Sequence, residues 1–156
     1  MPAKRSKAGA LVTVTVYRCQ LVEERTIAVT SAVVRDTAEA AALIRTFMGS
    51  PDREMFVLLM LTVDNHVLGL NMVALGDVGA VSFAPRELFK PALLRNAERI
   101  IVAHNHVTGE PRPSADDRKL TRLISKAART LGIELIDHLI IGRAGFYSFL
   151  DAGRLT

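Results

Sequence analysis

A short stretch in the second half of the chain gathers residue types that bind metals. It runs from His104 to Asp117, reads HNHVTGEPRPSADD, and directly follows the apolar run 99–103. Because alternate side chains of an extended segment point to the same side, His104 and His106 should project together. Two imidazoles on one side of a strand form a chelating pair.

Asp117 is the candidate third ligand. The intervening loop is turned and stiffened by Gly109, Pro111 and Pro113. A helix that starts at Ser114 can then bring Asp117 back over the two imidazoles. Three protein ligands, with a fourth tetrahedral position left to water, are typical of catalytic zinc sites.

The same residues also fit a plainer interpretation. Ser114-x-x-Asp117 is the pattern of a helix N-cap with an acidic third residue. The two functions are compatible, because one carboxylate can cap a helix and face a metal. The spacing alone therefore leaves two alternatives open, a metal site and an ordinary helix cap beside two surface histidines.

Composition limits what else the chain can be. Its 156 residues, 49% of them hydrophobic, suffice for one domain with a sizeable core, which we place at residues 10–156. The single cysteine, Cys19, excludes an intramolecular disulfide and a zinc site made of several thiolates. Any metal must therefore be held by histidines and carboxylates.

Charge and hydropathy bear on partners and location. The net charge of +4 allows weak attraction to nucleic acid, but residues 1–9 supply three cations that we interpret as a flexible, solubilising basic tail. No apolar run approaches the roughly 18 residues of a membrane span, and the N-terminus is too polar for a secretory signal. We expect a cytoplasmic protein that makes no membrane contact.

The elements that must position the stretch alternate between strands and helices. Strand patterns cover 11–17, 26–34, 55–61, 67–73, 81–83, 99–103, 133–141 and 146–149. Helix patterns cover 38–48, 85–97 with a kink or restart at Pro91, and a segment from Ser114 that Gly132 ends. Without any internal repeat, this order predicts a mixed α/β (α+β) fold with a central sheet flanked by helices.

Beyond its spacing, the stretch resembles a known motif. H-x-H, seven residues and then S-x-x-D is similar to the JAMM motif of MPN-type zinc metalloproteases. The longer pattern resembles the RadC family over about residues 30–150, through HNHVTGEPRPSADD and the later DHLIIG at 137–142. The segments APRELF at 84–89 and REMF at 53–56 also resemble family signatures. Val107 and Thr108 depart from the usual Pro and Ser, which affects the rigidity of the loop rather than the ligands.

The resemblance implies an MPN/JAB-like (cytidine-deaminase-like) domain with Zn²⁺ held by His104, His106 and Asp117. It also implies that Ser114 orients the attacking water or stabilises the oxyanion. A glutamate outside the motif completes a JAMM site as general base. Glu54, at the start of a predicted strand in a Glu-x-Phe context, is the candidate, and Glu87 is the alternative.

Some polar residues near the motif favour a structural role. Asp116 should face solvent, and His66 should be an ordinary surface histidine. Asp137 and His138 precede a hydrophobic run, where a buried polar side chain is more often hydrogen-bonded structure than a ligand.

Three functions follow as hypotheses. The first is a JAMM-type zinc hydrolase, a metallopeptidase or isopeptidase with a peptide or protein substrate. The second is a nucleic-acid-binding accessory domain, since the RadC family carries a traditional association with DNA repair. The third is a zinc-bearing interaction module without catalysis. The sequence leaves the substrate and a homo-oligomeric state open.

Overall fold

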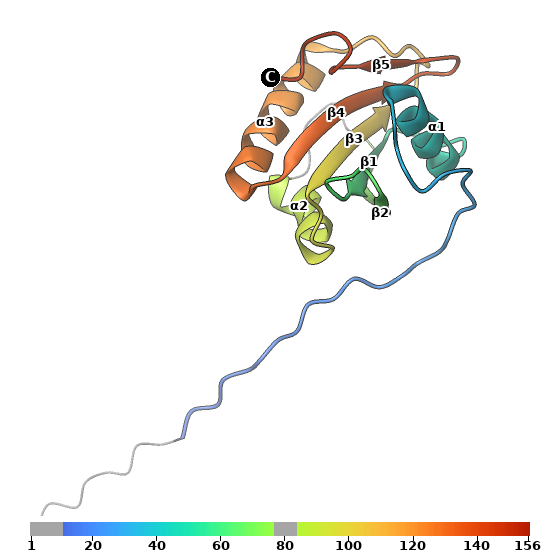
Figure 1. Cartoon of the computed structure of the whole chain (residues 1–156). Coiled ribbons are helices and arrows are strands. Elements are labelled where there is room, and N and C mark those ends of the chain that lie inside the picture. Colours follow the sequence, from blue (N-terminus) through green and yellow to red (C-terminus); the bar gives the residue numbers. More distant parts are fainter. Residues whose placement is uncertain (1–10, 77–83) are drawn as a thin grey trace, which may run out of the picture.

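The computed structural model describes residues 11–76 and 84–156, and in these residues one mixed sheet forms the centre of the molecule (Figure 1). The strand order is β2-β1-β3-β4-β5. The strands are β1 (Met55–Leu61), β2 (Val67–Leu75), β3 (Arg99–Asn105), β4 (Glu134–Ile141) and β5 (Phe146–Ser148). The helices are α1 (Thr37–Met48), α2 (Pro85–Leu94) and α3 (Ala115–Leu131). The predicted mixed sheet flanked by helices is confirmed.

The order of the strands brings α3 next to β3. Strand β1 pairs antiparallel with both β2 and β3, whereas β3 and β4 pair in parallel. A parallel pair needs a crossover, and α3 provides it. The loop between the end of β3 and the start of α3 is therefore the loop that carries the predicted motif.

The two faces of the sheet form separate cores, as the continuous apolar runs of β1 and β3 predict. One face packs on α2 and α3 through Phe56, Leu58, Met60, Ile100 and Val102 of the sheet and Leu88, Phe89, Leu120, Ile124 and Ala128 of the helices. The other face packs on α1 through Val57, Leu59, Leu61, Ile101 and Ala103. Side chains of one strand alternate between these cores, so the side chain after Ile100 and Val102 in the α3-facing row is His104.

The helix ends follow the signals in the sequence. The Asp36 side chain accepts a hydrogen bond from the Glu39 backbone N–H at 2.7 Å, which caps α1. Gly132, with φ of 70°, ends α3 in the left-handed conformation that glycine tolerates best. No helix in the described part of the chain is long and apolar enough to span a lipid bilayer.

The predictions of two strands near the N-terminus are wrong. Residues 11–17 form no strand, and Val12, Val14 and Val16 are largely exposed. Alternating Val and Thr fit a pleated strand, but a strand also needs a neighbour for its backbone hydrogen bonds, and this segment has none among the described residues. Of the predicted strand 26–34, a single bridge between Val33 and His66 is formed.

The second helix also differs from the prediction. Helix α2 runs without a break through Pro91 and ends at Leu94, instead of continuing to Ala97. Asn96 adopts a left-handed φ of 54°, which turns the chain toward β3. The predicted strand 81–83 lies outside the described residues.

Asp137, in the middle of β4, links this strand to the C-terminal part of the chain. Its carboxylate accepts hydrogen bonds from the Ser148 hydroxyl at 2.5 Å and from the backbone N–H groups of His138 and Leu150 at 2.7 and 2.9 Å. Burial raises the pKa of Asp137, although these hydrogen bonds oppose the shift. As expected, the Asp137 side chain is part of a buried hydrogen-bond network.

We predict that Asp137→Ala destabilises the fold. The substitution leaves buried donors without an acceptor, which costs about 3 kcal/mol of unfolding free energy. Urea unfolding followed by circular dichroism measures the loss. Asp151→Ala, which removes an exposed carboxylate that accepts from the Thr37 hydroxyl, is the matched control and should change stability by less than half as much. Equal stability of the two variants would contradict this account of Asp137.

Candidate metal centre

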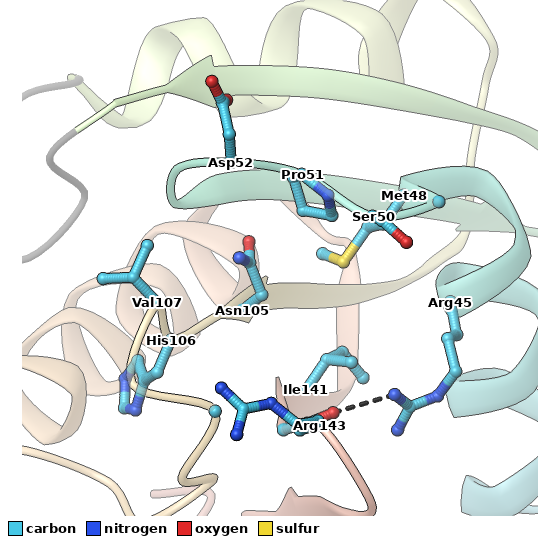
Figure 2. Close-up of a pocket in the computed structure, with 13 residues that line it drawn as sticks. Arg45, Met48, Ser50, Pro51, Asp52, Asn105, His106, Val107, Ile141 and Arg143 are labelled. Atoms are coloured by element: carbon cyan, nitrogen blue, oxygen red, sulfur yellow. Dashed lines mark hydrogen bonds between the residues drawn. The ribbon is translucent and has the colours of Figure 1, made fainter.

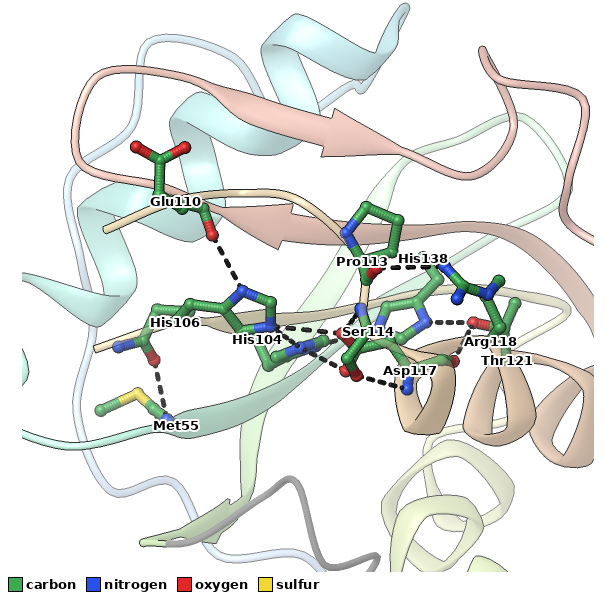
Figure 3. A network of polar contacts seen from close by, with 11 residues as sticks. Met55, His104, His106, Glu110, Pro113, Ser114, Asp117, Arg118, Thr121 and His138 are labelled. Carbon is green, nitrogen blue, oxygen red and sulfur yellow. Dashed lines mark hydrogen bonds and ion pairs between the residues drawn. The ribbon is translucent and has the colours of Figure 1, made fainter. Parts of the chain in front are cut away.

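The structure brings His104, His106 and Asp117 together at the start of α3 (Figure 3). Each offers one ligand atom, and these atoms lie within 4.8 Å of one another. Nε2 of His104 lies 3.0 Å from Oδ1 of Asp117, and Nε2 of His106 lies 3.3 Å from Oδ2. The two Nε2 atoms are 3.1 Å apart. The three candidate ligands thus converge on one point.

Asp117 reaches this point because it also caps the helix. The Ser114 backbone N–H donates to Oδ2 of Asp117 at 2.6 Å, and the Asp117 backbone N–H donates to the Ser114 hydroxyl at 3.0 Å. This reciprocal capping box fixes the carboxylate at the first turn of α3. The sequence leaves open whether Asp117 caps the helix or faces a metal. In the structure the one carboxylate caps the helix and also faces the two imidazoles.

The proton positions of His106 follow from its outer hydrogen bond. Nδ1 of His106 lies 2.8 Å from the carbonyl oxygen of Glu110. A carbonyl oxygen accepts but cannot donate, so Nδ1 carries a proton. In the neutral ring, Nε2 therefore keeps its lone pair and directs it toward Asp117.

A longer chain of hydrogen bonds assigns the same state to His104. The Thr121 hydroxyl donates to the carbonyl oxygen of Asp117 at 2.7 Å, so its oxygen must accept from Nδ1 of His138, 2.6 Å away. Burial lowers the pKa of His138 well below its ordinary value, and the ring is neutral. Its Nε2 therefore accepts from Nδ1 of His104 at 3.0 Å. Nε2 of His104 is left with a lone pair, which faces Asp117.

This donor set fits a cation. Two nitrogen lone pairs and a carboxylate repel one another unless a proton or a metal ion lies between them. When a proton occupies Nε2 of His104 or His106, that ring donates a hydrogen bond to Asp117. Burial would raise the pKa of Asp117, but these hydrogen bonds outweigh burial and hold this pKa far below its ordinary value. The hydrogen bond with Asp117 raises the pKa of His106. Two imidazoles and a carboxylate suit Zn²⁺ and similar divalent ions.

Glu54 lies beside this group. The pairing of β1 with β3 ends at Phe56 and His104, and two more residues in the same antiparallel direction would bring Glu54 toward His106. The negative charge of Glu54 contributes to the raised pKa of His106, which is consistent with this proximity. Glu54 is partly buried.

Asn105, the central residue of HNH, holds the backbone on both sides of Glu54. Its side-chain oxygen accepts from the Met55 N–H at 2.7 Å, and its amide nitrogen donates to the Arg53 carbonyl at 3.1 Å. The Glu54 carbonyl in turn accepts from the Gly76 N–H at 2.8 Å. The main chain at Glu54 is thus fixed against β3.

The alternative base, Glu87, lies in a different environment. Its carboxylate pairs with Lys90 at 2.8 Å and with Arg86 at 3.4 Å on the surface of α2. The hydrogen bond from Lys90 lowers the pKa of Glu87. Asp116 is exposed and pairs with Lys119, as expected for a solvent-facing residue.

A groove of about 440 Å³ opens on the His106 side of the group (Figure 2). Arg45 donates to the carbonyl oxygens of Gly142 and Gly145 at 2.8 and 3.0 Å, which fixes the turn after β4. The Arg143 side chain lies on that turn and lines the groove. A ligand in this groove would reach His106 from outside.

Sequence reasoning missed two residues of this arrangement and gave a third only a general role. The sequence patterns indicate no role for Asn105 or Thr121, and they predict His138 only as a buried, hydrogen-bonded residue without a specific partner. Asn105 lies between the two histidines, so its side chain points to the other side of the strand from theirs. That position is the only sequence signal for its contacts with the neighbouring backbone. Nothing in the sequence indicates that Thr121 would meet His138.

We predict that Thr121→Val weakens divalent metal binding while Thr121→Ser preserves it. Valine has the shape of threonine but cannot accept from His138, so the tautomer of His104 is no longer fixed. Loss of such an outer partner lowers metal affinity by about tenfold. Competition with a chromophoric chelator measures the Zn²⁺ affinity. Equal affinities of the two variants at equal apo-protein stability would exclude the proposed hydrogen-bond chain.

Comparisons with known proteins identify the family of this chain. Residues 34–154 match the model of the RadC-like JAB domain. The chain is 43% identical over 103 residues to a UPF0758 protein of Symbiobacterium thermophilum, which covers 66% of this chain and 44% of that protein. It is 39% and 41% identical over 123 residues to UPF0758 proteins of Desulfitobacterium hafniense and Moorella thermoacetica, with 79% of this chain and 54% of each relative covered.

The chain therefore spans about half the length of these relatives. The matched region contains the three candidate ligands, Glu54 and the helix cap. With a family model that covers most of its residues, the chain belongs to the RadC-like JAB domain family.

Proposed function

We propose that this domain is a zinc-dependent hydrolase of the JAMM type that cleaves an amide bond of a peptide or protein. The observation that carries the proposal is the convergence of two imidazole nitrogens and one carboxylate, whose ligand atoms lie within 4.8 Å of one another, while hydrogen bonds occupy both outer ring nitrogens. Such a group supports a metal centre with His104, His106 and Asp117 as ligands. An ordinary helix cap would not need the two imidazoles.

The proposed reaction divides its tasks among the surrounding residues. A zinc ion at this centre would supply a Lewis acid and bring the pKa of bound water to about 7. Glu54, whose charge acts on His106, would accept the proton of the attacking water and pass it to the leaving amine. Its fixed backbone supports this assignment over Glu87, whose carboxylate is engaged by Lys90.

Ser114 would assist at the carbonyl oxygen of the substrate. Its oxygen accepts from the Asp117 backbone, and its own proton can still donate to a ligand. Such a donor stabilises the negative charge that develops during attack. The residue is exposed at the edge of the group, so a substrate could reach it.

The first test is metal content. Protein purified without added metal should carry one zinc per chain, measured by elemental analysis, and His104→Ala should lose it. An Asp116→Ala variant, altered one residue from a candidate ligand at an exposed position, should keep the metal. Zinc content that is unaffected by His104→Ala would refute the assigned centre.

The second test separates an enzyme from a zinc-bearing interaction module. Glu54→Gln should keep the zinc but reduce hydrolysis of a pool of quenched fluorogenic peptides by at least about a hundredfold, because the proton acceptor is lost. Glu87→Gln is the matched control and should retain both properties. Full activity of Glu54→Gln would rule out Glu54 as the base, and a zinc-loaded wild-type chain without any activity would favour the interaction module.

A further inference from the structure

Three arginines surround one hollow next to the metal-ligand group. The hollow has a volume of about 550 Å³ and is lined by Arg112, Arg118 and Arg154, together with Pro113, Tyr147 and Ala152. It combines elements far apart in sequence: the motif loop, α3, β5 and the C-terminal turn. The arginines therefore come together through the fold and not through a local run of charge.

Two of these arginines are attached to fixed parts of the structure. The Arg118 guanidinium donates to the Pro113 carbonyl at 3.0 Å, as Figure 3 shows. The Arg154 backbone N–H donates to the Phe149 carbonyl at 2.8 Å, which fixes the turn that carries this side chain. Arg112 is exposed and lies between two prolines that limit the motion of its backbone.

The hollow contains positive charge without a matching carboxylate. No acidic residue lines it, and in the described parts of the chain none of the three guanidiniums takes part in an ion pair. Like charges around one site repel one another, and an anionic ligand would remove this repulsion. The guanidinium also matches carboxylates in a two-pronged geometry.

The position of the hollow relates it to the candidate reaction. Pro113 precedes the cap residue Ser114, and Arg118 follows the candidate ligand Asp117. The groove on the other side, beside His106, adds Arg143 to the same excess of positive charge. A chain bound across the metal-ligand group would meet arginines on both sides.

We propose that the Arg112–Arg118–Arg154 hollow binds an acidic segment of a polypeptide, and thereby selects substrates with Asp or Glu near the cleaved bond. This selection of substrate rests on the proposed hydrolase function, while binding of the acidic segment itself does not require the metal. The hollow also contains Tyr147, Pro113 and Ala152 beside the arginines. It adjoins the helix cap of the proposed peptide-cleaving site, so a segment of the same polypeptide substrate is the ligand that fits it.

Fluorescence anisotropy with a short labelled peptide rich in glutamate tests the binding. The same peptide with glutamine in place of each glutamate is the probe control. The zinc-loaded wild-type chain should bind the glutamate peptide about tenfold more tightly, and R112Q and R154Q should each remove most of that preference. The R122Q variant removes an exposed arginine from α3, outside the hollow, and should keep the preference.

The outcomes separate this inference from the metal proposal. Equal binding of the two peptides, or an equal loss in R122Q, would overturn the inference. So would a short DNA duplex that binds more tightly than the glutamate peptide and is released by the same substitutions. If His104→Ala still prefers the glutamate peptide, the result supports binding of an acidic segment in the hollow. That conclusion holds even if the variant, or the wild-type chain, carries no zinc.

Discussion

The arrangement at the start of α3 depends on where two imidazole protons lie. A histidine ring can present either nitrogen as an acceptor, and the neighbour of the other nitrogen decides which. Here a backbone carbonyl holds the outer proton of His106, and a neutral, fully buried histidine holds that of His104. Both inner nitrogens are thereby left to face Asp117, where they can hold a metal ion or, without one, a proton. A carboxylate that faces two such nitrogens makes the centre selective for positive charge.

The fold supplies this constraint through its two-sided sheet. His104 occupies the next place in the row of apolar side chains that packs on α3, and His138 occupies a buried place on the neighbouring strand β4. Phe56 stacks on His104 at a centroid distance of 5.8 Å, and Phe149 stacks on His138 at 5.0 Å. Aromatic packing therefore holds the rings whose nitrogens the hydrogen bonds orient. The polar centre is an extension of the hydrophobic core rather than a separate surface feature.

Local signals in the sequence determined much of this arrangement in advance. The Ser114-x-x-Asp117 cap, the apolar run before His104 and the glycine after α3 each predict a feature through contacts within a few residues, and each feature is present. The same reasoning failed at residues 11–17, because alternating Val and Thr describe a suitable strand but not the strand that would pair with it. It also missed Thr121, since its partner His138 is 17 residues away and reaches it only when β4 lies beside β3. Features that depend on such long-range packing need the tertiary structure.

The shared role of Asp117 has a thermodynamic consequence. The oxygen that accepts from the Ser114 backbone is also the oxygen nearest His106, so one carboxylate belongs both to the first turn of α3 and to the ligand group. Any cation that binds the folded centre but not the unfolded chain stabilises the domain, and the gain grows with the ratio of the cation concentration to its dissociation constant. The crossover between β3 and β4 begins at this turn, so a bound cation would stabilise the connection between these two central strands. Cation binding at the centre and the folding stability of the domain are thus thermodynamically linked, so a change in one changes the other.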